Sequence, residues 1–515
     1  MGKIKRNKKN IFIKTITIVI LIFVWFSIFI NYEFHDVSLE QLIFTLTNPA
    51  GANYEIVFTG TLFVLVGTIV TIILYQLFIK LWRSLKLSVV FKFSFKDKIF
   101  KLDIFKVNKF RFIVLYLVFV FCSIYLSVSL IELDDYIINM NNYSTIFEDY
   151  YVDSEEVNIT FPKNKKNLIF IVVESLESGN VSKDNGGISM ESYTPNLEKL
   201  ALKNINFSST DMIGGFNQVS NTSYTMTGLL SLTSGIPLKI PVDWNVYKSK
   251  RESLPGVYSI GEILEDNDYR NYFMLGSDAN YGGRRQYFEQ HGNYEIMDYY
   301  WAIDEGKIDK DYHVWWGYED LKLFDYAEEE LLKISKKDEP FNFTLLTADT
   351  HFTDGYMDDS CEINFDNKYA NAFYCADSKL GKFVSWIKKQ DFYDDTVIVI
   401  VGDHLVCQEG LYKNDETNRY VYNVIINSDI KTDNNKNRQV SHFDMMPTTL
   451  AAMGATIEGE RLGLGVNLFS DKKTLIERFG IDYVNEELLK KSVYYNDKII
   501  GDSYYDMMND KELLD

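Results

Sequence analysis

The longest apolar runs of the chain are concentrated before about residue 133. Three of them, over residues 11–30, 56–79 and 112–131, are nearly free of charged residues. A helix needs about 20 apolar residues to cross the hydrocarbon core of a bilayer, and buried helices of soluble domains rarely show such long uncharged runs. The pattern therefore predicts a membrane domain over residues 1–133 with three transmembrane helices.

The charges between these runs predict how the chain crosses the membrane. The first run follows a basic N-terminus, as a secretory signal peptide does, but it is long, lacks a small-residue cleavage site and is followed by two more runs. We therefore expect the first helix to be retained. Lys and Arg are held on the cytoplasmic side, and they are abundant at the N-terminus and over residues 80–111 but absent from residues 33–40. This asymmetry places everything after about residue 133 outside the cytoplasm.

After the third run the pattern changes twice. Residues 134–160 are rich in Asp, Asn, Tyr and Ser without a hydrophobic period, which is typical of a stalk. From residue 161 onward, short apolar runs alternate with amphipathic helix candidates at 321–334 and 369–388. The short runs, which are mostly β-branched or aromatic, are Leu168–Val173, Tyr272–Leu275, Phe343–Leu346, Val397–Val401 and Val421–Ile426. This alternation predicts an α/β domain over residues 161–475 with a mainly parallel central sheet, followed by a C-terminal extension over 476–515.

Polar residues follow several of these predicted strands directly. Ligands of a parallel sheet gather at the carboxyl ends of its strands, so these side chains are expected at one edge. They are Glu174, Ser277, Asp278, Asp349, His351, Asp403 and His404. Taken singly, each has an ordinary structural explanation, such as a helix cap or a surface histidine. Because the chain has only six His, the convergence of carboxylates and imidazoles favours a site for a divalent cation.

The net charge bears on which partners the chain can bind, and the cysteines bear on whether a disulfide forms. The net charge of -19 argues against nucleic acid as a partner, because a phosphate backbone needs a basic protein face. The basic residues 80–111 are explained by topology and by contact with anionic lipid. Cys361 and Cys375 enclose a loop of about 15 residues. A disulfide there, worth about 3 kcal/mol, and two buried thiols both fit the sequence.

Several sequence segments match, in order, those of a known superfamily. They are IFIVVES at 169–175, YTPNLEKLA at 193–201, SYTMTGLLSLTSGIPL at 223–238, LTADTHF at 346–352, IVGDHL at 400–405 and LGLGVNLFS at 462–470. The chain resembles the alkaline phosphatase and sulfatase superfamily over about residues 165–470. The likeness is greatest to the membrane-bound phosphoglycerol transferases, which include phosphoglycerol transferase I and lipoteichoic acid synthase.

The resemblance implies a sulfatase-like domain that holds one divalent metal ion. It implies that Glu174, Asp403 and His404 are metal ligands, together with a threonine that is also the nucleophile. Coordination suits this role, because a free hydroxyl is a poor nucleophile at neutral pH and a bound cation lowers its pKa. Manganese is the first expectation, with magnesium and zinc as alternatives, since this set of donors accepts each of them.

The nucleophile is expected to be Thr225, with Thr222 as the alternative. Thr225 stands about ten residues before Gly235, as the nucleophile of the family does, and it would open a helix whose backbone N–H groups face a phosphate. Helix capping is the structural alternative for this hydroxyl. The resemblance also implies that Arg284 and His351 bind substrate. His442 and Asp444 match a stretch near the site in some relatives and are candidates for supporting the ligands from outside.

The activity implied by the resemblance is transfer of phosphoglycerol from phosphatidylglycerol to an extracytoplasmic glycan or polymer acceptor, through a covalent phosphothreonine. The enzyme would be a multi-pass protein of the bacterial cytoplasmic (inner) membrane, with its catalytic domain in the periplasm or its equivalent. Alternatives within this fold are a phosphoethanolamine transferase and a lipoteichoic acid synthase-type polymerase. A sulfatase fits less well, because SYTMTG lacks the Pro and Arg that follow a sulfatase nucleophile. A non-catalytic sensor or scaffold is the alternative from a different class.

Overall fold

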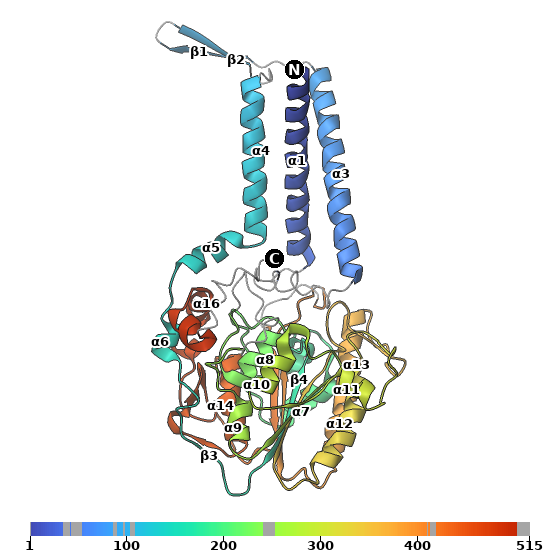
Figure 1. Cartoon of the computed structure of the whole chain (residues 1–515), viewed down its shortest axis with the longest axis vertical. Coiled ribbons are helices and arrows are strands. Elements are labelled where there is room, and N and C mark those ends of the chain that lie inside the picture. The colour runs from blue at the N-terminus through green and yellow to red at the C-terminus, as the bar shows by residue number, and fades with distance from the viewer. Residues whose placement is uncertain are drawn as a thin grey trace. The chain divides into compact units, whose positions relative to one another are not determined.

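The structure is a computed structural model that describes residues 2–33, 42, 54–85, 90–95, 98–103, 109–239, 253–408, 410–412 and 419–501. The chain divides into two compact units. The first comprises Met1–Leu39 and Ala52–Ile137, and the second comprises Glu40–Gly51 and Ile138–Asp515. Figure 1 shows the helices and strands of both units.

The first unit contains three long apolar helices. These are α1 (Gly2–Glu33), α3 (Tyr54–Leu85) and α4 (Lys109–Leu130). Within them, Ile11–Tyr32, Val57–Phe78 and Ile113–Leu130 are long and apolar enough to cross a membrane. The prediction of three such helices is therefore confirmed. Two short strands, β1 (Val90–Phe95) and β2 (Lys98–Asp103), form an antiparallel hairpin between α3 and α4.

Close packing and one polar contact join the helices of this unit. Trp25 of α1 donates a hydrogen bond from Nε1 to the hydroxyl of Thr71 on α3, at 3.0 Å. The same indole ring covers Gly67, where an added Cβ would lie 2.4 Å from the ring. A glycine at this position therefore permits the close approach of α1 to α3, as small residues do between membrane helices.

The second unit is built around a seven-stranded sheet with the order β5-β10-β9-β4-β8-β6-β7. Its strands are β4 (Asn167–Val173), β5 (Gly215–Phe216), β6 (Arg270–Leu275), β7 (Glu295–Met297), β8 (Phe341–Leu346), β9 (Thr396–Gly402) and β10 (Val421–Ile426). β9, β4, β8, β6 and β7 are parallel neighbours, whereas β10 runs antiparallel to β9 and to β5. The predicted α/β class with a mainly parallel sheet is confirmed.

The direction of β10 is the exception among the expected strands. Val421–Ile426 is buried throughout, like its parallel neighbours, so its apolar run resembles theirs. An apolar run of this kind reports burial on both faces of a sheet and carries no information on strand direction. Because β10 is antiparallel, the residues that follow it lie at the opposite edge of the sheet from Glu174 and Asp403.

Helices cover both faces of the sheet and give it two hydrophobic cores. Alternate residues of β4 point to opposite sides, because side chains of a strand alternate with period two. Leu168, Phe170 and Val172 join a core with residues of α8 (Thr225–Ser234), α9 (Ile260–Glu265), α10 (Arg284–Gln290) and α14 (Met445–Ala452). Ile169, Ile171 and Val173 join the other core with residues of α7 (Pro195–Lys203), α11 (Tyr299–Asp304), α12 (Asp320–Ile334) and α13 (Lys368–Ile387). The sheet is therefore the middle of three layers.

The segment expected as a stalk is partly helical and partly buried. It forms α5 (Leu133–Asn141) and α6 (Ile146–Tyr150). Phe147 is buried, and its ring lies 5.1 Å from that of Tyr495. The segment expected as a stalk over residues 134–160 therefore contains two short helices and a buried aromatic residue.

The segment after the predicted domain also packs into the first of these cores. It contains α15 (Leu475–Phe479), α16 (Ile481–Leu489) and a short helix at Tyr495–Ile500. Val484, Leu488 and Ile499 of this segment are buried. Cys361 and Cys375 form a disulfide, which decides between the two states that the sequence left open.

Candidate metal centre

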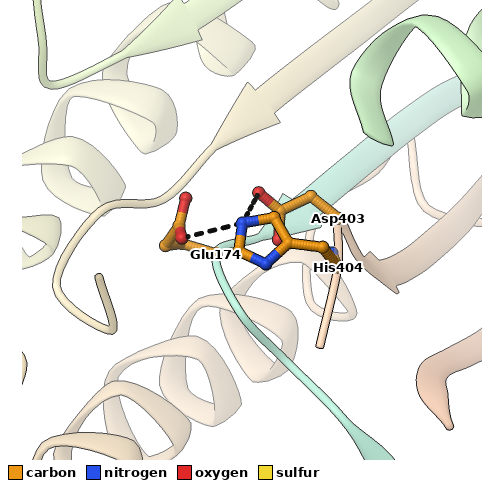
Figure 2. A group of neighbouring side chains, drawn as sticks. All are labelled: Glu174, Asp403 and His404. Atoms are coloured by element: carbon orange, nitrogen blue, oxygen red, sulfur yellow. Dashed lines mark hydrogen bonds and ion pairs between the residues drawn. The ribbon is translucent and has the colours of Figure 1, made fainter. Parts of the chain in front are cut away.

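Two neighbouring parallel strands bring three potential metal ligands together. The register of β4 and β9 places Val173 opposite Gly402, so the next residues, Glu174 and Asp403, leave the sheet at the same edge. One ligand atom each from Glu174, Asp403 and His404 lie within 4.8 Å of one another (Figure 2). All three side chains are buried. The structure thus brings together the three expected ligands that follow these strands.

The imidazole of His404 stands between the two carboxylates (Figure 2). Its Nε2 is 3.3 Å from Oε1 of Glu174 and 3.5 Å from Oδ2 of Asp403. Nδ1 lies 2.8 Å from the carbonyl oxygen of Leu405, which accepts a hydrogen bond when Nδ1 carries the proton. That bond fixes the ring and directs Nε2 toward the carboxylates. A neutral imidazole held in this way is the usual form of a metal-binding histidine.

Asp403 has one oxygen that is held by the backbone and one that is not. Oδ1 accepts hydrogen bonds from the amides of Ser175 at 2.7 Å and His404 at 2.8 Å. Oδ2 is buried and has no hydrogen-bond partner. A buried carboxylate oxygen without a donor is costly and calls for an explanation, of which a bound cation is one. Burial, and then the charge of Glu174, raise the pKa of Asp403 to about 8.

Glu174 connects the ligand cluster to a hydroxyl. Its Oε1 accepts a hydrogen bond from the hydroxyl of Ser175 at 2.8 Å, and its Oε2 accepts one from the hydroxyl of Thr225 at 3.1 Å. Burial raises the pKa of Glu174, but the imidazoles of His351 and His404 lower it by more, so its pKa stays below the ordinary range. For His404 burial lowers the pKa, and the carboxylates of Asp403 and Glu174 outweigh this and raise it well above its usual value.

The structure distinguishes the two candidate threonines. Thr225 is the first residue of α8, and its hydroxyl reaches Glu174. Thr222 is fully buried, and its hydroxyl donates to the carbonyl oxygen of Val219 at 2.7 Å. Only Thr225 therefore touches the ligand cluster. Its position at a helix N-terminus adds backbone N–H groups and a partial positive charge, which suit an anionic phosphate.

A glycine allows α8 to approach the ligands. A Cβ added at Gly228 would lie 2.3 Å from the carbonyl oxygen of Asp403. Any larger residue at this position would therefore push the first turn of α8, which carries Thr225, away from the end of β9. The short sequence TMTG thus joins the hydroxyl and the close contact in a single helical turn.

Arg284 and His351 lie near the cluster and interact electrostatically with Glu174. Arg284 is buried, and its Nε and Nη2 donate to the carbonyl oxygens of Tyr281 at 2.9 Å and Asp278 at 2.8 Å. Nδ1 of His351 lies 2.6 Å from the carbonyl oxygen of Phe352. Burial lowers the pKa of both groups, and the charge of Glu174 opposes the shift. Both side chains are therefore held by backbone carbonyls beside the cluster.

His442 and Asp444 have different positions. His442 is buried, and its Nε2 lies 2.8 Å from the carbonyl oxygen of Asp403, which accepts a hydrogen bond from it. Burial lowers the pKa of His442 to about 4, so the ring is neutral. Asp444 accepts from the amides of Ser441 at 2.8 Å and Val466 at 2.9 Å, and burial raises its pKa to about 7. His442 thus contacts the backbone of Asp403 directly, whereas Asp444 holds the turn on which His442 stands.

Three residues expected at this edge do not join the cluster. Asp349 forms an ion pair with Lys379, with 2.7 Å between Oδ2 and Nζ. Oδ1 of Asp278 accepts from the amide of Asn280 at 2.8 Å and so caps a turn. Ser277 is buried, and its backbone pairs with Gly317. These three residues lie at the predicted edge but outside the group of potential ligands, and Asp349 and Asp278 have local partners that the sequence pattern does not reveal.

Sequence reasoning also missed residues that hold the ligands. Ser175 has φ of 54° and binds both Glu174 and Asp403 through its hydroxyl and amide. The hydroxyl of Thr347 accepts from the amide of Glu174 at 3.2 Å. Gln218 accepts from the amide of Leu405 at 2.7 Å through Oε1. Ser175 is the second residue after β4 and Thr347 the first after β8, so their place after predicted strands was a usable signal, whereas nothing in the sequence singles out Gln218.

The donor set fits a divalent cation. Two carboxylates, one imidazole nitrogen and a hydroxyl converge, and among the described residues the only ion-pair partner of Glu174 and Asp403 is His404. The site is therefore buried, and neither carboxylate forms an ion pair with a lysine or arginine of the described residues. Oxygen donors with a single imidazole suit manganese, magnesium or zinc.

Comparisons with known proteins identify relatives of the second unit. A sulfatase family model matches residues 166–455. The chain is 30% identical over 274 residues to phosphoglycerol transferase I of Salmonella typhimurium, an alignment that covers 52% of this chain and 34% of that protein. It is 30% identical over 276 residues to phosphoglycerol transferase I of Escherichia coli O127:H6, with the same coverage. The chain thus spans about a third of the length of the curated relatives it matches.

Solved structures with a similar fold include two from other bacteria. A protein in the alkaline phosphatase superfamily from Vibrio parahaemolyticus is 23% identical, with a TM-score of 0.45 and coverage of 62% of this chain and 74% of that one. A lipoteichoic acid synthase from Listeria monocytogenes is 20% identical, with a TM-score of 0.45 and coverage of 63% and 81%.

Proposed function

The chain belongs to the sulfatase family, and from this premise we propose that it transfers phosphoglycerol from phosphatidylglycerol to a hydroxyl of a glycan or polymer acceptor. The two relatives are named phosphoglycerol transferase I, which supports phosphoglycerol as the transferred group. The observation that carries the proposal is the hydroxyl of Thr225 hydrogen-bonded to Glu174, beside the buried Oδ2 of Asp403, which accepts no hydrogen bond. This arrangement suits a hydroxyl nucleophile that is activated by a cation.

In this proposal Glu174, Thr225, Asp403 and His404 hold one divalent ion, with manganese as the first expectation and magnesium or zinc as alternatives. The bound ion supplies positive charge that lowers the pKa of the Thr225 hydroxyl and neutralises charge on the phosphoryl oxygens. The residues themselves do the positioning. The amides of Ser175 and His404 hold Oδ1 of Asp403 by hydrogen bonds, and the carbonyl oxygen of Leu405 holds Nδ1 of His404.

The first half-reaction forms a covalent phosphothreonine. The hydroxyl of Thr225 already directs its proton to Oε2 of Glu174. Its oxygen bonds to phosphorus, the bond from phosphorus to the diacylglycerol oxygen breaks, and diacylglycerol leaves with a proton. Arg284 and Nε2 of His351 bind the phosphoryl oxygens, since a guanidinium is well matched to phosphate. The backbone N–H groups at the start of α8 stabilise the same charge.

The second half-reaction regenerates the threonine. An acceptor hydroxyl gives up its proton, bonds to the phosphorus, and the bond from phosphorus to the Thr225 oxygen breaks. Thr225 recovers a proton, and the acceptor leaves with the phosphoglycerol group. The two half-reactions use the same residues in opposite directions, as covalent catalysis generally does.

The membrane helices give this chemistry its setting. We place the chain in the bacterial cytoplasmic (inner) membrane, with three transmembrane helices and the second unit on the periplasmic or outer side. The basic residues 80–111 and the acidic segment after α4 support this orientation. An anchored enzyme remains next to a donor whose headgroup is confined to the bilayer surface.

The test is to follow the headgroup onto the protein. The full chain is reconstituted with manganese in vesicles that contain phosphatidylglycerol labelled in its headgroup glycerol. We expect label on the wild-type chain and on Thr222→Ala, and none on Thr225→Ala. Absence of label from the wild type, or label that persists in Thr225→Ala, would contradict the proposal. Vesicles with headgroup-labelled phosphatidylethanolamine test the rival donor, and the length of the product distinguishes single transfer from polymerisation.

A further inference from the structure

The antiparallel direction of β10 brings its first residues, and not its last, to the edge of the sheet where the potential metal ligands lie. Its register with β9 pairs Asn423 with Val401 and Ile426 with Ile398, so β10 begins beside the end of β9. Arg419 stands two positions before the first residue of this strand. A search confined to residues that follow strands therefore passes over Arg419, although it lies at the same edge.

The segment that follows β4 crosses the end of β9 and joins the start of β10. The amide of Ser178 donates to the carbonyl oxygen of Tyr420 at 2.7 Å, and the amide of Tyr422 donates to that of Leu176 at 3.2 Å. A Cβ added at Gly402 would lie 2.0 Å from the carbonyl oxygen of Leu176, so a glycine at the end of β9 permits the crossing. The segment that carries Glu174 is thereby brought to the start of β10.

The guanidinium of Arg419 connects the two segments that carry the ligands. Its Nε donates to Oε2 of Glu177 at 2.9 Å, three residues after Glu174. Its Nη2 donates to the carbonyl oxygen of Val406 at 2.6 Å, two residues after His404. The side chain of Glu177 is fully buried, and that of Arg419 is 17% exposed. Because the N–H groups of a guanidinium form a rigid planar fork, this contact sets the spacing between the two segments.

The backbone that Arg419 holds is continuous with the backbone that orients His404. The carbonyl oxygen of Leu405 lies 2.8 Å from Nδ1 of His404, and the amide of Leu405 donates to Oε1 of Gln218 at 2.7 Å. Arg419 holds the next carbonyl group along the chain, that of Val406. A shift of this backbone would therefore turn the imidazole whose Nε2 faces the two carboxylates (Figure 2).

Stability alone is a weak reason for this ion pair. Oε1 of Glu177 is buried and accepts no hydrogen bond, so the pair is incompletely satisfied. The cost of taking two charges out of water offsets much of the attraction within a buried pair, whereas fixing one arrangement is a use that some buried pairs serve. Burial raises the pKa of Glu177, and the charges of Arg419 and, more weakly, of His404 oppose this shift. The pair thus lies within electrostatic reach of a proposed metal ligand.

We propose that Arg419 is a positioning residue of the metal centre. It holds the segment after β4 and the segment after β9 at the spacing that lets their three ligands share one divalent cation. It acts through Glu177 and the backbone of Val406, and not by contact with the ion. This inference rests on the metal site of the proposed function. A role through position and a role through charge predict opposite results, because removing only the arginine charge would strengthen the binding of a cation near Glu177.

The test uses cobalt, whose visible absorption depends on the geometry of its ligands. The purified full chain is freed of metal and titrated with cobalt, and affinity is measured by calorimetry. We expect Arg419→Met to bind cobalt about 10–100-fold more weakly than the wild type, with a changed spectrum at saturation. Arg419→Lys keeps the charge but not the planar fork, so we expect a loss of about tenfold. Equal or higher affinity in Arg419→Met would overturn the proposal, and if that variant does not fold, wild-type affinity in Arg419→Lys would do so.

The matched control is a second arginine that pairs with a glutamate in the same unit. Nε of Arg438 donates to Oε1 of Glu477 at 2.6 Å, and its Nη1 and Nη2 donate to the carbonyl oxygens of Leu468 at 3.3 Å and Lys472 at 3.1 Å. None of these partners belongs to the metal site. Arg438→Lys should leave the affinity for cobalt and the spectrum of the bound ion unchanged. Equal losses in Arg438→Lys and Arg419→Lys would show a general effect of weakened packing and contradict a specific role for Arg419.

Two variants at Glu177 separate the geometry of the ion pair from its charge. Glu177→Gln keeps an oxygen that can accept from Nε of Arg419, whereas Glu177→Ala does not, and both remove the same charge. We expect bound cobalt to keep the wild-type spectrum in Glu177→Gln and to show an altered one in Glu177→Ala. Equally altered spectra would mean that position is not what the pair supplies. A wild type that binds no cobalt would overturn the proposed metal centre together with this inference, whereas a wild type and an Arg419→Lys chain that bind it equally would overturn this inference alone.

Discussion

Two groups of buried acids lie at the same edge of the sheet, and they differ in what neutralises them. β9 and β8 are the two neighbours of β4. Glu174 and Asp403, which follow β4 and β9, have ion pairs only with the imidazole of His404 among the residues that the structure describes. Asp349, which follows β8, lies 2.7 Å from the ammonium of Lys379. Burial and neighbouring charge also raise the pKa of Asp320, whose carboxylate accepts from the amide of Asp349.

The difference separates a binding site from a structural ion pair. Lys379 has a buried ammonium between Asp349 and Asp358, so its group of acids is neutralised within the protein. The group around Asp403 has two carboxylates and a single imidazole, and the described residues offer it no lysine or arginine ion pair. Uncompensated buried charge is costly, and proteins retain it mainly where a ligand neutralises it. The position of an acid at a strand end is therefore a weaker indicator of function than the absence of a basic partner.

The largest expected effect comes from neutralising Asp403. Asp403→Asn keeps the shape of the side chain and the acceptor for the amides of Ser175 and His404, but removes the charge from Oδ2. We expect at least about a 100-fold loss of manganese affinity, beyond the effect typical of residues that only support a ligand. Calorimetric titration of the purified full chain measures it. The matched control, Asp349→Asn, should bind manganese as the wild type does. Equal losses of manganese affinity in the two variants would contradict the distinction between the Asp403 group and the Asp349 group.

The second prediction concerns the free energy of unfolding and the group of acids around Asp349. Lys379→Met removes a buried ammonium and leaves Asp349 and Asp358 without their partner. Breaking a buried ion pair from one side typically costs about 3–5 kcal/mol. We expect a loss of this size in the free energy of unfolding of the second unit, measured by denaturant titration, with manganese affinity unchanged. Lys379→Met combined with Asp349→Asn should recover part of the loss, and a double variant no better than the single one would contradict the pairing.

The sheet could be predicted from the sequence, because each central strand is buried on both faces and is therefore a continuous apolar run. The sequence also predicted that Glu174, Asp403 and His404 would meet, since strand ends of a parallel sheet share an edge. It could not exclude Asp349, because the residue that neutralises it is Lys379, thirty positions later on α13. Partners of that kind depend on how helices pack over the sheet, and no local pattern encodes them.

The choice of threonine shows the same limit at shorter range. Thr222 and Thr225 are three residues apart and chemically identical, so spacing alone left both open. The structure turns one hydroxyl to a backbone carbonyl and the other to Glu174, through the start of α8. The direction of a side chain at a helix start depends on the entry of the preceding loop, which the sequence does not specify.

A smaller effect is expected from His442, which supports Asp403 through its backbone. His442→Ala removes the donor to the carbonyl oxygen of Asp403. Losing such a supporting contact typically lowers metal affinity about 10–100-fold. We expect a loss in this range by calorimetric titration, and a smaller one in His442→Gln, whose amide can still donate. Unchanged affinity in His442→Ala would show that the charge difference between the two groups, and not the fixing of Asp403, determines binding.

The smallest effect is a pH dependence that only the uncompensated group should show. Burial and the charge of Glu174 raise the pKa of Asp403 to about 8 in the absence of an ion. A cation must displace that proton below about pH 8, so manganese affinity should rise with pH, by up to about tenfold per unit, and level off above it. Calorimetry in two buffers of different ionisation enthalpy measures the proton released. Asp349→Asn should leave this release unchanged, because its carboxylate belongs to the group that Lys379 neutralises. Affinity that stays constant between pH 6 and pH 8 would contradict the presence of such a proton on Asp403.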